Sequence, residues 1–261
     1  PKSEFGRNSK LIGVSANINI AGFSIALLLP FAIQLMLKSK NKIKSILLIS
    51  IILFSFSAFL TGSRGAILSI TIIFLAYLIK VFVVKQPLKN KIFKSLIIVT
   101  PFLISILATE VLFDSMSYSY RINQITERGS NSRLKYYNDA IESIKEKPIL
   151  GIGIGNWKFN SIDKGKRHIE GYIVPYHAHN DFIQILAETG ILGFLSYSSI
   201  FIFSFFNLRK IRNFYNNPIL FSCFLFLIVY LFDANLNFPI ARPIMQINWA
   251  LIIAILLKYE K

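Results

Sequence analysis

The chain has 261 residues, of which 54% are apolar, and its 29 basic against 13 acidic side chains give a net charge of +16. A mean hydropathy of +0.54 and 24 phenylalanines exclude a soluble globular domain and predict an integral membrane protein. The basic residues are spread over both predicted sides of the membrane, which argues for contact with anionic membrane lipids and against a nucleic-acid partner. The single cysteine, Cys223, excludes disulfides and cysteine-based metal sites.

Seven apolar segments are candidates for membrane-spanning helices. The first, residues 16–37, has 22 residues without formal charge, which as a helix measure about 33 Å and can cross a hydrocarbon core of about 30 Å. The other six cover about 45–60, 65–84, 95–113, 190–208, 218–235 and 244–257. The predicted fold class is an all-α polytopic membrane protein with about seven transmembrane helices. Because the chain begins at Pro1 and its first dozen residues resemble an external loop, we expect it to be N-terminally truncated.

Clusters of lysine and arginine set the expected orientation of these helices. They lie between the first and second spans, between the third and fourth, and after the fifth, and short loops rich in these residues stay in the cytoplasm. Arg64 and Arg242 are each the only basic residue of an external loop. We therefore expect transmembrane helices 1–4 at 14–113, an extracytoplasmic loop domain at 114–178, and a re-entrant half-helix with transmembrane helices 5–7 at 179–261.

A polar turn interrupts the apolar stretch between the second and third spans. Residues 61–65 read Thr-Gly-Ser-Arg-Gly and fall on the predicted external side. One interpretation is a tight turn whose Arg64 extends to the membrane interface. We favour the other: an arginine at the head of a helix combines the positive end of the helix dipole with a planar donor group, which suits phosphate.

The predicted loop domain contains one amphipathic helix and one glycine-rich turn. Apolar residues at spacings of three, four and three, from Leu134 to Ile144, predict a helix that ends at Pro148, with Arg133 at the border of its apolar stripe. The sequence Gly-Ile-Gly-Ile-Gly at 151–155 lacks the spacing and the βαβ context of a nucleotide-binding loop. We interpret it as a flexible turn that carries an interfacial tryptophan, Trp157.

The most polar chemistry of the chain lies where it re-enters the membrane. Asp181, Gln184 and Glu188 form a polar stripe at helical spacing, and His177 precedes Asp181 by four residues. Ionisable groups at membrane depth are costly and usually carry function. Two alternatives remain open: a His-x-His metal site formed by His177, His179 and Asp181, and simple capping of a helix start by Asn180 or Asp181.

These residues resemble the O-antigen ligase and polymerase family of bacterial membrane glycosyltransferases. Its ligases carry the pattern H-[NSQ]-x9-G-x-x-[GTY], which His179, Asn180, Gly190 and Gly193 match completely. Three further stretches look like the family in the same order: the turn at 61–65, the segment from Ser132 to Asn156, and Asn237-Phe238-Pro239. The resemblance implies transfer of a glycan from a polyprenyl diphosphate carrier, usually undecaprenyl diphosphate, to an acceptor outside the cytoplasm, with no cofactor, metal or nucleotide sugar.

The resemblance also suggests roles for individual residues. Arg64 and Arg133 would bind the leaving diphosphate, and His179 would orient the acceptor hydroxyl and take its proton. The remaining candidates, all for substrate binding, are His177, Asn180, Asp181, Glu188 and Arg242. The acceptor could be a saccharide, the lipid A core or a protein, and the expected location is the bacterial cytoplasmic (inner) membrane with the active site on its extracytoplasmic face. The alternative function is a lipid-linked oligosaccharide flippase or transporter.

Overall fold

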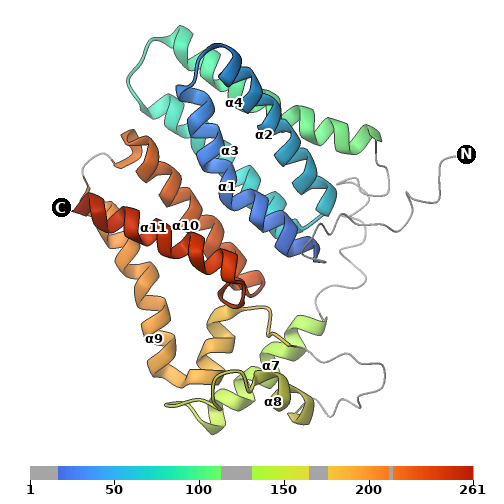
Figure 1. Cartoon of the computed structure of the whole chain (residues 1–261). Helices are drawn as coiled ribbons and strands as arrows, with labels where there is room; N and C mark the ends of the chain where they lie inside the picture. Colours follow the sequence, from blue (N-terminus) through green and yellow to red (C-terminus); the bar gives the residue numbers. More distant parts are fainter. Residues whose placement is uncertain (1–16, 113–130, 165–175, 212–213, 261) are drawn as a thin grey trace, which may run out of the picture. The chain divides into compact units, whose positions relative to one another are not determined.

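The computed structural model describes residues 17–112, 131–164, 176–211 and 214–260, and the regular structure in these ranges is entirely helical (Figure 1). The elements, in chain order, are α1 (Ile18–Lys38), α2 (Asn41–Thr61), α3 (Arg64–Val83), α4 (Leu88–Leu112), α7 (Asn131–Glu146), α8 (Trp157–Lys164), α9 (Asp181–Lys210), η4 (Phe214–Asn216), α10 (Pro218–Leu236), η5 (Pro239–Ala241) and α11 (Pro243–Glu260). The all-α class predicted from the sequence is confirmed.

Six of the described helices are long and apolar enough to cross a membrane: α1, α2, α3, α4, α9 and α10. They correspond to the first six predicted spans. The seventh predicted span forms α11, whose apolar stretch Pro243–Tyr259 is shorter than the other six. The protein is therefore a multi-pass membrane protein.

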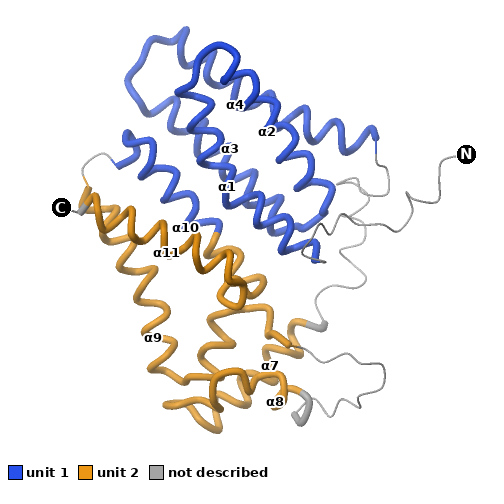
Figure 2. The backbone as a smooth tube through the Cα atoms, in the orientation of Figure 1, with its two compact units in different colours: residues 1–125, 212–229 blue, residues 126–211, 230–261 orange. Residues whose placement is uncertain are grey.

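The chain divides into two compact units (Figure 2). Unit 1 comprises residues 1–125 and 212–229, and unit 2 comprises residues 126–211 and 230–261. The boundary falls within α10, so the first part of this helix belongs to unit 1 and its last turns belong to unit 2. Each unit is described by itself below.

In unit 1, α1 packs on α2 and α3, and α4 packs on α2 and α3. Close approach depends on small side chains, as in other membrane helix pairs. A Cβ at Gly22 of α1 would lie 2.7 Å from that of Ala66 in α3. Large apolar side chains such as Ile46, Leu53 and Leu75 are more than half exposed on the outside of the unit, where a soluble protein would place polar residues. This surface is suited to lipid.

The turn between α2 and α3 is built as the sequence predicts. Gly62 ends α2 with a left-handed backbone at φ 60°, and the Ser63 side chain caps the first turn of α3. The Ser63 hydroxyl also donates a hydrogen bond of 2.8 Å to Asn19 Oδ1 in α1, which fixes the turn. Arg64 is the first residue of α3, and its side chain is exposed.

Unit 2 contains a small core that joins the predicted loop domain to α9. Ala140, Trp157, Ala178 and Ala187 are fully buried, and Tyr136, Ile144 and Ile183 pack against them. Trp157 therefore anchors α8 in the core, and the sequence-based interpretation of an interfacial tryptophan is wrong. The predicted stripe of α7 is also partly wrong: Leu134 and Ile141 are exposed, whereas Asp139, which is not part of that stripe, is buried. Tyr136 and Ala140, each one position before a residue of the predicted stripe, form the packing face instead.

Close backbone contacts at two glycines join the glycine-rich turn to α9. Gly190 has φ 66° and ψ −166°, which breaks α9 into a short first helix and a long second one. The carbonyl oxygens of Ala187 and Glu188 accept hydrogen bonds of 2.9 and 2.8 Å from the amides of Ile152 and Gly153. Added Cβ atoms at Gly151 and Gly190 would each collide with backbone of the other segment. The amides of this turn therefore satisfy carbonyl groups of α9 that precede the break.

Candidate functional site

His179 lies just before α9, held between aromatic rings from two other elements of unit 2. Its ring stacks on Tyr136 of α7, with centroids 6.2 Å apart, and meets the edge of Phe238 at 5.4 Å. Its backbone has φ 57°, a left-handed conformation that is uncommon for a residue with a side chain. The Tyr137 hydroxyl donates a hydrogen bond of 3.4 Å to its carbonyl oxygen. Such a backbone persists only where its surroundings hold it.

Phe238 joins His179 to two other candidate residues. The His177 ring stacks on Phe238 with centroids 4.1 Å apart and planes inclined by 15°. The guanidinium carbon of Arg242 lies 5.8 Å from the centre of the same ring. We call His177, His179 and Phe238 the histidine cluster. The role of Phe238 as a shared ring was not predicted, because its sequence stretch was noted only for its resemblance to the family.

Both imidazoles of the histidine cluster have lowered pKa values. Burial, the largest cause, lowers the pKa of His179 to about 4, and the nearby positive charges of Arg133 and His177 act in the same direction. Burial likewise lowers the pKa of His177, with Arg242 adding to the effect and Gln184 opposing it. Among the described residues, neither Nδ1 atom has a hydrogen-bond partner. The structure thus brings His177, His179, Arg133 and Arg242 into one electrostatic neighbourhood.

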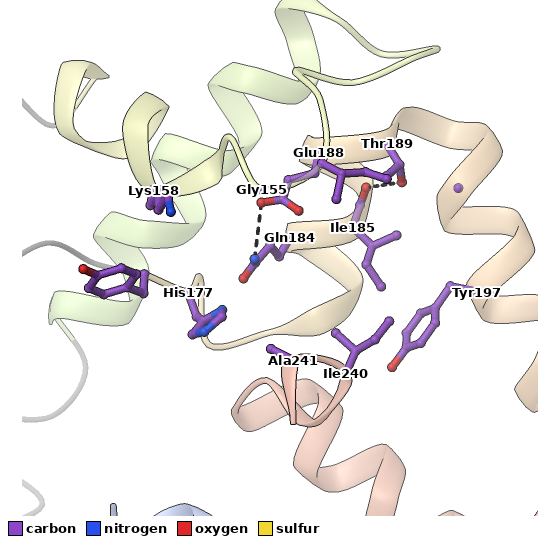
Figure 3. A pocket seen from close by; sticks show the side chains of 13 residues that line it. Gly155, Lys158, His177, Gln184, Ile185, Glu188, Thr189, Tyr197, Ile240 and Ala241 are labelled. Carbon is purple, nitrogen blue, oxygen red and sulfur yellow. Dashed lines mark hydrogen bonds between the residues drawn. The ribbon is translucent and has the colours of Figure 1, made fainter. Parts of the chain in front are cut away.

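A pocket of about 520 Å³ opens beside the histidine cluster, and His177 belongs to its wall (Figure 3). Glu188 also lines the pocket and is buried, with 8% of its surface exposed. Its Oε1 accepts hydrogen bonds of 3.1 Å from the Trp157 amide and 3.4 Å from Gln184 Nε2. Gln184 and Glu188 of the predicted polar stripe therefore line a cavity, with Glu188 anchored in its wall, whereas Asp181 of that stripe does not line it.

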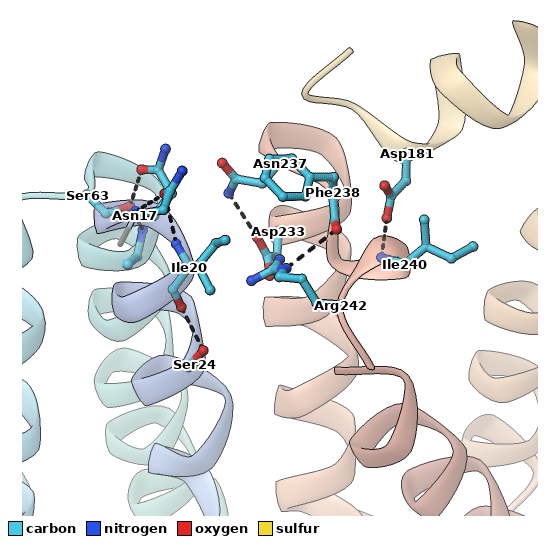
Figure 4. A network of polar contacts seen from close by, with 12 residues as sticks. Asn17, Ile20, Ser24, Ser63, Asp181, Asp233, Asn237, Phe238, Ile240 and Arg242 are labelled. Carbon is cyan, nitrogen blue, oxygen red and sulfur yellow. Dashed lines mark hydrogen bonds and ion pairs between the residues drawn. The ribbon is translucent and has the colours of Figure 1, made fainter. Parts of the chain in front are cut away.

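Arg242 is anchored by a carboxylate that sequence reasoning missed (Figure 4). Its Nη2 forms an ion pair with the fully buried Asp233, whose other oxygen accepts a hydrogen bond of 2.8 Å from Asn237 Nδ2. Its Nε donates to the Phe238 carbonyl oxygen at 3.4 Å. Nη1 is buried without a hydrogen-bond partner among the described residues. The available signal for Asp233 was its position as the single acidic residue of an apolar run, since such residues usually carry function.

Asn180 and Asp181 hold elements in place. Asn180 is the N-cap of α9, and its Oδ1 accepts a hydrogen bond of 3.1 Å from the Ile183 amide. Asp181 is 1% exposed, and its Oδ2 accepts a hydrogen bond of 3.0 Å from the Ile240 amide (Figure 4). The same oxygen accepts a hydrogen bond of 3.3 Å from the Tyr197 hydroxyl. The capping alternative raised by the sequence thus holds for Asn180. Direct contact of either residue with substrate stays a prediction.

The comparison with known families decides the class of the protein. Residues 49–198, more than half of the chain, match the sequence model of the O-antigen ligase family. The chain belongs to the O-antigen ligase family. No curated protein matches it. The recognition made from the sequence is confirmed, and family membership indicates an enzymatic role of the ligase or glycosyltransferase type in polysaccharide synthesis.

The residues of the ligase pattern each have a structural role in this chain. His179 contributes its ring to the histidine cluster, Asn180 caps α9, and Gly190 makes the helix break. A side chain at Gly193 would collide with Thr189 across that break. The matched range includes Arg64, Arg133 and both histidines, whereas Phe238 and Arg242 lie beyond it.

Two further sequence-based predictions concern Arg64 and the alternative metal site. Arg64 lies in unit 1, at the head of α3, while the histidine cluster lies in unit 2. Over the residues that the structure describes, no three His, Cys, Asp or Glu side chains come together in a way that could hold a metal ion. In particular, Asp181 directs its Oδ2 to the Ile240 amide and the Tyr197 hydroxyl.

Proposed function

We propose that this member of the O-antigen ligase family transfers a glycan from a polyprenyl diphosphate carrier, undecaprenyl diphosphate in particular, to an acceptor hydroxyl on the extracytoplasmic face of the bacterial cytoplasmic membrane. The observation that carries the proposal is the pair of half-buried imidazoles of His177 and His179 beside the charges of Arg133 and Arg242. Transfer from a diphosphate needs a proton acceptor and a cation, and this neighbourhood offers both.

The arginines are assigned to the diphosphate of the donor. When the bond between the anomeric carbon and the diphosphate oxygen breaks, its electron pair leaves with the diphosphate, and negative charge grows on the phosphate oxygens. Guanidinium groups donate paired hydrogen bonds to such oxygens, and we assign this role to Arg133 and Arg64. For Arg64 the support is its exposed side chain at the N-terminus of α3, where the helix dipole adds to its charge.

His179 is assigned to the acceptor hydroxyl. The hydroxyl oxygen bonds to the anomeric carbon, its proton passes to the imidazole, and polyprenyl diphosphate leaves. An imidazole with a pKa of about 4 is neutral at physiological pH, so its lone pair is available. A bound diphosphate would offset the charge of Arg133 and raise this pKa. Donor binding would therefore strengthen His179 as a base at the stage when one is needed.

The other candidates are given supporting roles. Arg242 presents a buried Nη1 beside Phe238 that has no hydrogen-bond partner within the described part of the chain, which suits an anionic or hydroxyl-bearing substrate group. His177 and Glu188 line the adjacent pocket. Asn180 and Asp181 use side-chain oxygens to hold the start of α9 and η5, so we assign them to positioning the site.

The decisive experiment is an assay of the protein in liposomes with a radiolabelled undecaprenyl-diphosphate-linked glycan. Candidate acceptors are free saccharides, lipid A core and protein. Label recovered on an acceptor supports transfer and identifies the acceptor class. Label that crosses the bilayer without leaving its carrier would instead establish the flippase alternative and overturn the proposal.

The proposed face of the membrane is tested by labelling single cysteines. The native Cys223 is buried and is replaced by alanine as background. Cysteine at the exposed Lys135 of α7 should react with an impermeant thiol reagent in intact spheroplasts, and cysteine at the exposed Asn90 of α4 only after lysis. Reversed labelling would place the site on the cytoplasmic face.

We also propose that arginines, and not a metal ion, hold the diphosphate. Transfer should then continue unchanged in the presence of a chelator. Activity that disappears with chelator and returns with zinc would favour the His-x-His metal alternative.

A further inference from the structure

We propose that the pocket beside the histidine cluster is the binding site for the acceptor, and that it takes a terminal sugar unit without net charge. The inference rests on the proposed function, since it presumes that a saccharide acceptor reacts at His179. It adds the location and the chemical class of the second substrate.

The size and lining of the pocket suit a sugar ring. Its volume of about 520 Å³ lies within the range of roughly 300–1,000 Å³ typical of small-ligand sites. Apolar side chains such as Ile154, Ile185 and Ile240 form much of the wall, and Tyr176 also lines the pocket. A pyranose has an apolar face of C–H groups and a rim of hydroxyls, so it needs both kinds of surface.

Glu188 supplies a fixed acceptor for sugar hydroxyls. Its Oε1 is held by the Trp157 amide and by Gln184, so the carboxylate has one orientation. No described residue donates a hydrogen bond to its second oxygen, Oε2. A carboxylate accepts strong hydrogen bonds from hydroxyl groups and repels the oxygens of a diphosphate. Glu188 therefore favours a sugar over the donor's diphosphate in this pocket.

The charge of the pocket is balanced, unlike that of the histidine cluster. Lys158 of α8 lines the same pocket, with its Nζ 5.8 Å from the ring centre of Tyr176. Its positive charge and the negative charge of Glu188 cancel. Around the imidazoles, by contrast, the charges that lower the pKa values are those of Arg133 and Arg242. The pocket therefore favours an uncharged polar substrate, and the region around the imidazoles favours an anionic one.

His177 connects the pocket to the reacting groups. It lines the pocket and stacks on Phe238, whose ring also meets His179. A sugar seated against Glu188 would therefore lie next to the histidine cluster. This arrangement brings an acceptor hydroxyl toward the proposed base while the arginines hold the donor.

The test uses two pocket variants with matched controls in the liposome assay. Ala241→Phe places a ring in the pocket, and Glu188→Gln removes the charge but keeps an oxygen for the Trp157 amide. We expect KM for the acceptor to rise about tenfold or more in each, with KM for the donor unchanged. The controls Asn138→Phe and Glu142→Gln, at exposed positions of α7, should behave as the wild type.

A binding measurement keeps the test independent of turnover. Saturation-transfer NMR with a panel of methyl glycosides, recorded without donor, should give signals for the wild type that weaken in Ala241→Phe. If the wild type transfers glycan but both pocket variants keep its acceptor KM and NMR signals, the inference is overturned and the proposed function stands. If KM rises for the donor alone, the pocket belongs to the donor and the inference also fails. If the wild type consumes no lipid-linked glycan with any acceptor, the proposed function itself fails.

Discussion

The two units of this member of the O-antigen ligase family differ in the polar contacts that they bury. In unit 1, hydroxyls such as those of Ser24, Ser69 and Thr71 donate to the carbonyl four residues earlier in their own helix. In unit 2, Asp233 and Arg242 form a buried ion pair between segments. Burying charge costs free energy unless it is paired, so such groups are kept where they serve a purpose. We therefore expect a membrane scaffold in unit 1 and the chemistry in unit 2, with Arg64 as the exception to be tested.

The largest expected effect comes from removing the proposed base. His179→Ala should lower the rate of transfer by at least about a hundredfold, because a general base typically contributes about 10²- to 10⁴-fold. KM for the donor should change little. His177→Ala removes a ring of the same cluster and should cost less. Full activity in His179→Ala would separate the histidine cluster from the chemistry and weaken the contrast between the units.

The helix break of unit 2 should be intolerant of a side chain. Gly190→Ala places a Cβ against the Ile149 carbonyl at a backbone φ of 66°, so we expect a loss of about 3 kcal/mol or more in unfolding free energy. Gly155→Ala is the matched control: its φ is 77°, but a Cβ there meets open space, and we expect a cost of about 1 kcal/mol. Thermal unfolding in detergent measures both. Equal melting temperatures for the two variants would contradict the backbone contact.

The arginines test whether unit 1 takes part in the chemistry. Arg133→Lys and Arg64→Lys keep the charge but lose the paired donors, and each should lower transfer about tenfold while the protein still accumulates. Arg209→Lys, in the last turn of α9, is the control and should be neutral. If only Arg133→Lys is impaired, the diphosphate site belongs to unit 2 alone and the contrast becomes sharper.

The smallest expected effect is a shift in pH dependence. The pKa of His179 is lowered to about 4, so the free enzyme should keep the base unprotonated down to about pH 5 and lose kcat/KM only as the pH falls further. Arg133→Gln removes a positive neighbour, which raises this pKa, so the acid limb of the residual activity should move toward neutral pH. Burial is the larger cause, and the limb should therefore stay below pH 6.5. An acid limb already at 6.5 in the wild type would show that His179 is solvated.

Much of the fold could be predicted because its signals are local. The apolar segments gave the membrane helices, and the position of Arg64 at a helix head followed from its neighbouring glycines. The sequence analysis predicted a re-entrant half-helix and a separate span that begins near 190, and the helix break at Gly190 lies where the two meet. The prediction of the packing face of α7 was wrong because helical spacing alone did not separate the exposed Leu134 from the buried Ala140. Only the contacts of Trp157 and Tyr136 identify that face.

The sequence by itself determined that this chain enters a membrane, where its helices lie, and that His179 begins a ligase-type pattern, because hydropathy and spacing are properties of neighbouring residues. The tertiary structure alone decided that Phe238 is the ring shared by His177, His179 and Arg242, and that Asp233 balances Arg242. These residues come from segments far apart in the chain. Their proximity depends on how α7, α9 and η5 pack, which periodicity within one segment cannot encode.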